Sequence, residues 1–281
     1  MSELEYALNT FYLLISGAFV MWMAAGFTML EAGLVRSKNV SEIVTKNLGL
    51  YSIACVMYLV CGFFLMYPGD SVYNAYFPML GSTWGMSLDG LTFNTDLGYS
   101  DAADFFFQVV FVATAMSIIS GAVAERMKFN GYLIITILAT GIIYPIVGHW
   151  AWSSSYLNNM DPVNQLLTVT NEIKSTGWLT DIGFVDFAGS TIVHSVGGWI
   201  ALSAVLILGP RIGKYSDSNK GKFTGSSFPL AVLGTLILWF GWFGFNGGSN
   251  GAMDETVPLI LINTFLAASF GLLTGLSISF I

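Results

Sequence analysis

The stretch Asp186-Phe-Ala-Gly-Ser-Thr-Ile-Val-His194 places an acid and an imidazole at the start of an apolar segment that continues to about Leu208. An ionisable side chain at membrane depth costs about 2.5 to 3.5 kcal/mol on insertion scales, so it marks a candidate functional site. Eight residues of helix rise about 12 Å, which would put Asp186 near one membrane face and His194 near mid-depth. The small residues between them favour close approach of another helix. We therefore expect a membrane helix with an acid at its mouth and a titratable group deep inside.

Composition indicates an all-α integral membrane protein, a polytopic helical bundle. Hydrophobic residues make up 54% of the chain and charged residues only 10%, whereas soluble domains carry about 25% charged residues. The net charge of -7 leaves no basic patch for nucleic acid. Cys55 and Cys61 lie six residues apart in one apolar segment, which suits neither a disulfide nor a zinc site. We expect them to be packing residues, and we expect no metal and no cofactor.

A helix needs about 20 residues to cross a 30 Å hydrocarbon core, and seven apolar segments approach or exceed this length. They run roughly over residues 11–34, 47–68, 104–124, 129–152, 187–208, 228–246 and 257–281. The N-terminal Met-Ser-Glu-Leu-Glu-Tyr is acidic, whereas a secretory signal begins with a basic stretch. The sequence therefore predicts seven spans, the first of which is retained.

The basic residues predict the orientation of these spans. Of ten lysines and arginines, nine fall in alternate loops on one side, namely Arg36, Lys38, Lys46, Arg126, Lys128, Arg211, Lys214, Lys220 and Lys222. The positive-inside rule assigns that side to the cytoplasm and puts the N-terminus outside. We expect a multi-pass protein of the plasma membrane, which is the inner membrane of a bacterial cell.

Aromatic and polar residues gather at the predicted outer ends of three spans. Phe107 and Phe111 share one helical face at spacing i and i+4, and Trp152 ends its own span. Phe245 and Ser249 lie in Gly-Phe-Asn-Gly-Gly-Ser, a glycine-rich polar end typical of backbone that lines a cavity. An aromatic belt at the membrane interface is the alternative for each aromatic residue taken singly.

Four motifs together resemble the ammonium transporter family (Amt/Mep/Rh). They are the stretch 186–194, Gly-Trp-Phe-Gly-Phe-Asn-Gly-Gly-Ser at 241–249, Leu-Glu-Ala-Gly-Leu-Val-Arg-Ser-Lys-Asn at 30–39, and Gly-Ala-Val-Ala-Glu-Arg at 121–126. The resemblance implies eleven helices in two inverted repeats of five and a homotrimer with one pore per subunit. Residues 1–281 would then supply one transmembrane domain, with helices one to five at about 11–208 and the start of the second repeat at about 228–281.

The same resemblance implies the roles of individual residues. Phe111, Trp152 and Ser249 would line an external ammonium site, which Asp186 supports from beside the outer vestibule. Phe107, Phe111 and Phe245 would belong to the pore and its phenylalanine gate, and His194 would lie in the apolar pore below. The family places a second histidine beside His194 on its tenth helix, which lies beyond residue 281. A PII-type regulator would dock on the cytoplasmic side.

Physical chemistry agrees with ammonium recruitment followed by passage of ammonia. A desolvated cation over an aromatic face gains about 2 kcal/mol, and a serine hydroxyl adds about 1 kcal/mol. Moving the ion into a low-dielectric interior costs on the order of 20 kcal/mol in the Born limit. A dry gated pore should therefore pass mainly neutral ammonia, after the proton leaves near the mouth. A buried neutral imidazole offers one donor and one acceptor nitrogen for this passage.

Several alternatives remain open at this stage. His194 alone is compatible with a hydrogen bond between helices, and we assign His149 to that role. We expect Glu31 to pair with basic residues at the cytoplasmic end. The alternative function is that of an ammonium sensor, the receptor domain of a signalling protein with a C-terminal output module. A retinal protein is disfavoured because residues 257–281 contain no lysine, and no nucleophile and base at workable spacing indicate an enzyme.

The last segment predicts that the sequence belongs to a longer protein. Residues 270–281 end inside an apolar run without a basic flank, and seven spans leave the second repeat incomplete. We expect four further spans and a second pore histidine, and a signalling module after them would identify a sensor.

Overall fold

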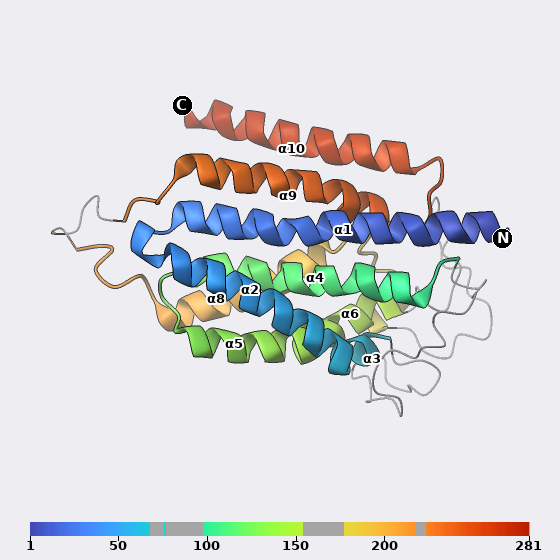
Figure 1. Ribbon diagram of the computed structural model, residues 1–281, viewed down its shortest axis with the longest axis horizontal. Helices are drawn as coiled ribbons and strands as arrows, with labels where there is room; N and C mark the ends of the chain where they lie inside the picture. The colour runs from blue at the N-terminus through green and yellow to red at the C-terminus, as the bar shows by residue number, and fades with distance from the viewer. Residues whose placement is uncertain (68–75, 77–97, 154–176, 217, 219–222, 281) are drawn as a thin grey trace.

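The computed structural model describes residues 1–67, 76, 98–153, 177–216, 218 and 223–280. Over these residues the chain is a bundle of roughly parallel and antiparallel helices (Figure 1). Seven helical segments are long and apolar enough to cross a membrane. The predicted all-helical class and the seven spans are confirmed.

The spans follow the chain in order, and several are built from consecutive helical segments. They are α1 (Glu3–Leu34); η1 (Ser37–Asn39), α2 (Val40–Met57), η2 (Tyr58–Gly62) and α3 (Phe63–Met66); α4 (Asp101–Ala122); α5 (Phe129–Leu138), η5 (Ala139–Ile143) and α6 (Tyr144–Trp152); η7 (Ser190–Ser195) and α8 (Val196–Leu208); α9 (Phe228–Gly248); and α10 (Val257–Ser279). A short helix, α7 (Trp178–Asp181), precedes the fifth span. The segments η2, η5 and η7 are π-helical turns, which are common at functional sites.

The predicted start of the second span at residue 47 is wrong, because the helical segment begins at Ser37 and α2 at Val40. Lys46 and Asn47 made this part of the sequence resemble an interfacial loop, yet each is only 5% exposed. The Lys46 ammonium donates to the Ser120 carbonyl at 2.9 Å and lies 3.6 Å from the Glu31 carboxylate. A polar side chain that finds partners inside the bundle can thus lie within a membrane helix.

Glu31 pairs with a basic residue as predicted, and its partner is Lys46. The Oε2 atom of Glu31 also accepts hydrogen bonds from Ser120 Oγ at 2.7 Å and Asn47 Nδ2 at 3.3 Å. These contacts tie α1 to α2 and α4 inside the bundle.

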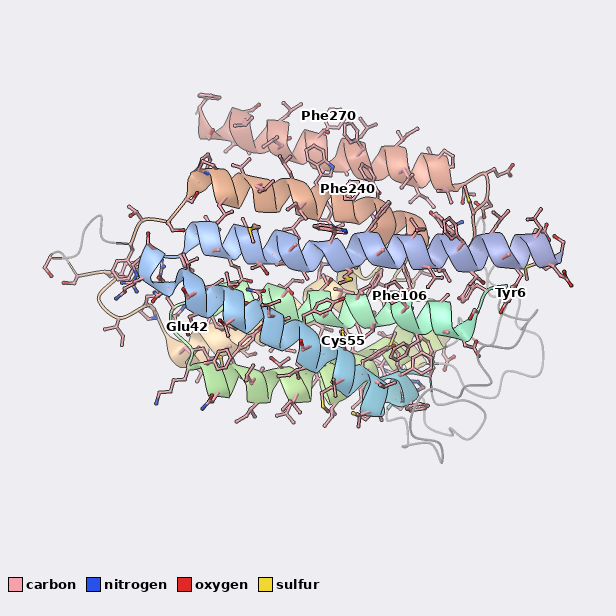
Figure 2. The ribbon with its side chains drawn as sticks, viewed as in Figure 1. Tyr6, Glu42, Cys55, Phe106, Phe240 and Phe270 are labelled. Carbon is pink, nitrogen blue, oxygen red and sulfur yellow. The ribbon has the colours of Figure 1, made fainter. Side chains whose placement is uncertain are left out.

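α4 forms the centre of the bundle, and most of its side chains are buried. Figure 1 shows α1 and α9 on one side of it and α5 on the other, while α2 crosses it obliquely. α10 is the outermost helix and packs on α9, where Asn246 Nδ2 donates to Thr264 Oγ1 at 2.9 Å. Phe270 on α10 is 64% exposed and projects away from the other helices (Figure 2).

α1 and α9 pack with their backbones in contact. A Cβ atom added at Gly234 of α9 would lie 2.3 Å from the Leu30 amide nitrogen and 2.6 Å from the Gly26 carbonyl oxygen. One added at Gly244 would lie 2.3 Å from the Ser16 carbonyl oxygen. Only glycine permits such an approach, which is the packing mode that small residues provide between membrane helices. We call this contact the α1–α9 seam.

The basic loops meet at one end of the bundle, around the buried carboxylate of Glu125. Its Oε1 accepts from Arg36 Nε at 3.0 Å and Asn39 Nδ2 at 2.6 Å, and its Oε2 accepts from Arg211. Burial disfavours the charged carboxylate, but the hydrogen bonds from Arg36, Asn39 and Arg211 outweigh it and lower the pKa of Glu125 to about 2. We call this end the basic end, and the N-terminus lies at the opposite end (Figure 1).

Two further predictions concern packing residues. His149 Nδ1 lies 3.3 Å from the Met66 carbonyl oxygen, so His149 joins α6 to α3 as expected of a residue that links helices. Both cysteines are free. The buried Cys61 Sγ lies 3.2 Å from the Gly141 carbonyl oxygen, and thereby joins the π-helical turns η2 and η5.

Candidate functional site

Asp186 holds the entrance of the fifth span through its carboxylate. Oδ1 accepts from the backbone N–H groups of Gly189 at 2.8 Å and Ser190 at 2.9 Å. Oδ2 accepts from those of Thr191 at 2.9 Å and Ile192 at 2.8 Å. The first backbone N–H groups of a helix have no carbonyl acceptor within the helix, and here the Asp186 side chain accepts from four of them. Asp186 is therefore committed to the backbone and shapes the site without a free carboxylate oxygen.

The predicted start of this span, at about residue 187, lies three residues before the observed start. The helix begins at Ser190, because Gly189 adopts the left-handed conformation with φ +98°. A Cβ atom there would lie 2.5 Å from Val193 Cγ2, so glycine is required by both conformation and space. Asp186 consequently precedes the helix instead of forming its first turn.

Trp152 is fixed against this entrance. Its indole Nε1 donates to the Asp186 carbonyl oxygen at 2.7 Å, and the side chain is 9% exposed. The indole meets the Phe111 ring at a centroid distance of 6.4 Å and an interplanar angle of 80°. An indole held in this way can present its face to a cation without losing further conformational entropy.

The phenylalanine rings of α4 and α9 stack at the next level. Phe111 and Phe245 lie 4.1 Å apart at 29°, and each is 1% exposed. Phe107 packs against Phe111 at 4.6 Å, one helical turn nearer the beginning of α4. Two stacked rings at this distance leave no space between their faces, and together they present apolar surface.

His194 follows directly behind this stack. Its ring lies 5.5 Å from that of Phe245 at 67°. Its Nδ1 is 3.2 Å from the Gly189 carbonyl oxygen, which also accepts from the His194 backbone N–H in the π-helical turn η7. A carbonyl can only accept, so in the neutral ring Nδ1 carries the proton and Nε2 is the acceptor.

Ser249 lies at the end of α9, as its C-cap. Its hydroxyl donates to the Phe245 carbonyl oxygen at 2.7 Å, which leaves the oxygen lone pairs able to accept a hydrogen bond. The preceding Gly248 adjoins Phe107, since a Cβ atom there would lie 2.6 Å from Phe107 Cε2. Ser249 thus extends from the same helix end that touches the aromatic residues.

The structure therefore brings the predicted residues into one series, in the order Trp152, Phe111, Phe245 and His194. Phe107 joins it from the side, and Asp186 supports it from behind Trp152. The role of Gly189, whose carbonyl orients His194, was not predicted from the sequence. The signal was present, because an isolated glycine inside an apolar segment often marks an irregular backbone position.

Comparison with known proteins places this arrangement among related membrane proteins. The family model described as "Ammonium Transporter Family" matches residues 11–281. A relative from Synechocystis is 44% identical over 95% of this chain and 46% of its own length. Ammonium transporter Amt2 of Archaeoglobus fulgidus is 40% identical over 99% of this chain and 55% of that protein. The chain thus spans about half the length of the curated relatives it matches.

Solved structures agree in fold. The structure titled "Sensor Amt Protein" is 37% identical with a TM-score of 0.77, over 96% of this chain and 61% of that one. Candida albicans Mep2 matches with a TM-score of 0.72 at 24% identity, over 93% of this chain and 52% of its own, which is a likeness of fold. The family match covers nearly all of the sequence and includes the four motifs that carried the resemblance. The chain belongs to the ammonium transporter family.

Proposed function

We propose that this chain recruits ammonium at the outer end of the bundle and forms part of the path along which ammonia crosses the membrane. The observation that carries the proposal is the continuous series from Trp152 through the stacked Phe111 and Phe245 to His194. A cation is attracted to the aromatic entrance, whereas the apolar stack opposes passage of a charge. Ammonium would give its proton to solvent water at the entrance before the stack, and the acceptor nitrogen of His194 would accept a hydrogen bond from the neutral ammonia behind it.

Replacing Trp152 with leucine is expected to weaken ammonium binding about tenfold, which is about 1.4 kcal/mol, because the cation loses its aromatic partner. His194→Ala should leave that binding largely intact and impair passage. Isothermal titration of the purified full-length protein measures the first effect, and liposome flux measures the second.

Trp199→Leu is the matched control, because Trp199 lies on α8 and is 67% exposed. It should bind ammonium like the unaltered protein. An unchanged affinity in Trp152→Leu would support an aromatic interfacial belt, and the recruitment proposal would then fail.

An ammonium sensor is the second candidate, and the similarity to the structure titled "Sensor Amt Protein" favours it. A sensor and a transporter share ammonium recruitment but differ in flux. In the full-length protein, ammonium binding without flux in liposomes would replace the transporter proposal with the sensor proposal.

We further propose a plasma-membrane location with the basic end in the cytoplasm, as the loop charges favour. A cysteine introduced at position 40, close to the basic end, should resist an impermeant thiol reagent in intact cells and react after permeabilisation. Equal labelling in intact cells would reverse the orientation.

The functional assembly is proposed to be a homotrimer, and the basic end is the proposed docking face for a PII-type regulator. Native mass spectrometry of the full-length protein, alone and with such a regulator, counts the subunits and detects the complex. A monomer, or no complex, would contradict the corresponding part of the proposal.

A further inference from the structure

A cavity of about 250 Å³ lies at the basic end, between the ends of α1 and α4 and the loop that follows α8. Its apolar wall includes Leu34 and Val35, and Glu31 lies in its lining. Three cationic residues complete it, namely Arg126, Arg211 and Lys214. None of the aromatic residues from Trp152 to Phe245 lines this cavity, so it is separate from the ammonium site proposed above.

The carboxylates at and near the cavity already have cationic partners. Glu31 lies 3.6 Å from the Lys46 ammonium. Glu125, which precedes Arg126, pairs with Arg36 at 3.0 Å and with Arg211. Neither carboxylate is therefore left to neutralise the remaining cations of the lining.

Arg126 and Lys214 have no carboxylate within ion-pair distance among the residues that the structure describes. The Arg126 guanidinium donates through Nη1 to the Gly209 carbonyl at 2.9 Å and through Nη2 to the Ala122 carbonyl at 2.6 Å. Its Nε is buried without a hydrogen-bond partner in this part of the chain. Lys214 is exposed, and its ammonium lies 6.0 Å from the Tyr215 ring centroid.

The helix ends do not cancel this positive charge. α1, α4 and α8 all end beside the cavity, and each C-terminus contributes about half a negative charge. The charged residues of the lining and the ion pairs connected to them comprise two carboxylates, Glu31 and Glu125, and five cations, namely Arg36, Lys46, Arg126, Arg211 and Lys214. The surplus of cations exceeds the three half-charges, so the cavity favours an anion.

We propose that this cavity binds a phosphate group, supplied either by an anionic lipid headgroup of the adjacent leaflet or by a free phosphate. Basic pockets between membrane helices suit lipid phosphates, and guanidinium groups match the geometry of phosphate oxygens. A water molecule occupies about 30 Å³, so 250 Å³ holds a phosphate group together with several waters.

The test measures the thermal stability of the delipidated full-length protein in detergent, with three probes added separately. They are short-chain phosphatidylglycerol, inorganic phosphate, and diacylglycerol of the same chain length as a control without phosphate. A ligand of the folded state raises the unfolding temperature with increasing concentration. We expect the first or both of the phosphate-bearing probes to do so, and diacylglycerol to have no effect.

Lys214→Gln should lower the affinity of the protein for the stabilising probe about fivefold. This corresponds to about 1 kcal/mol, the contribution of one basic residue near a lipid phosphate. Lys214→Arg should keep the response. Lys38→Gln is the matched control, because Lys38 is an exposed cation at the same end and does not line the cavity. Arg126 is a weaker choice for the test, since it also binds the ends of two helices.

The outcomes test the proposal and identify the source of the phosphate group. Stabilisation by the lipid alone identifies a headgroup site, and stabilisation by inorganic phosphate as well identifies a general phosphate site. No response to either probe, or an equal response in Lys214→Gln and the unaltered protein, would overturn the proposal.

Discussion

Replacing Gly234 with alanine is expected to destabilise the bundle by about 3 kcal/mol, at the upper end of the usual cost of overpacking. The added methyl group would lie within 2.8 Å of three backbone atoms of α1, at Leu30 and Gly26. Backbone atoms cannot rotate away as a side chain can, so α1 and α9 must separate over part of the α1–α9 seam. Thermal unfolding of the full-length protein in detergent measures the loss.

Gly198→Ala is the matched control for this substitution. Gly198 also lies inside a membrane helix, α8, but a Cβ atom there would meet nothing within 4 Å. The control should be neutral or slightly stabilising, because alanine has the higher helix propensity. If both variants lost the same stability, close packing would not be the reason for glycine at position 234.

Replacing Asp186 with asparagine should destabilise the entrance of the fifth span by at least about 3 kcal/mol. Hydrogen bonds to a charged group contribute about 1.5 to 3 kcal/mol each, and the Asp186 carboxylate accepts four. Asparagine keeps one carbonyl oxygen as an acceptor. Its NH2 group can only donate, so the two backbone N–H groups that face it lose their acceptor. We expect lower thermal stability together with at least tenfold weaker ammonium binding.

The loss of binding follows from two contacts of the same turn. The Asp186 carbonyl positions the Trp152 indole, and the Gly189 carbonyl orients His194. Asp181→Asn is a suitable control, since Asp181 is exposed and precedes this turn in the chain. Normal ammonium affinity in Asp186→Asn, measured by titration, would show that the carboxylate is dispensable for the geometry of the site.

The sequence predicted the spans and the aromatic series, because apolar length and motif positions are properties of the chain itself. It did not predict that the second span begins before Lys46. Hydropathy depends on residue type alone, and it does not include the partners that allow a lysine to be buried. The turn at Gly189 was missed for a similar reason. The shape of this turn depends on four backbone N–H groups that donate to one carboxylate, and the hydrophobic pattern of the sequence does not predict such hydrogen bonds. The partner of Glu31 likewise depends on how α1 and α2 fold together.

The α1–α9 seam also limits how the bundle can move. Two helices whose backbones touch cannot slide or tilt past one another by even an ångström without collision, so they should behave as one rigid body. Phe245 belongs to that body, whereas its stacking partner Phe111 belongs to α4. Opening of the stack therefore requires rotation of the rings, or displacement of α4 against the joined pair, and bending of α9 alone would not suffice.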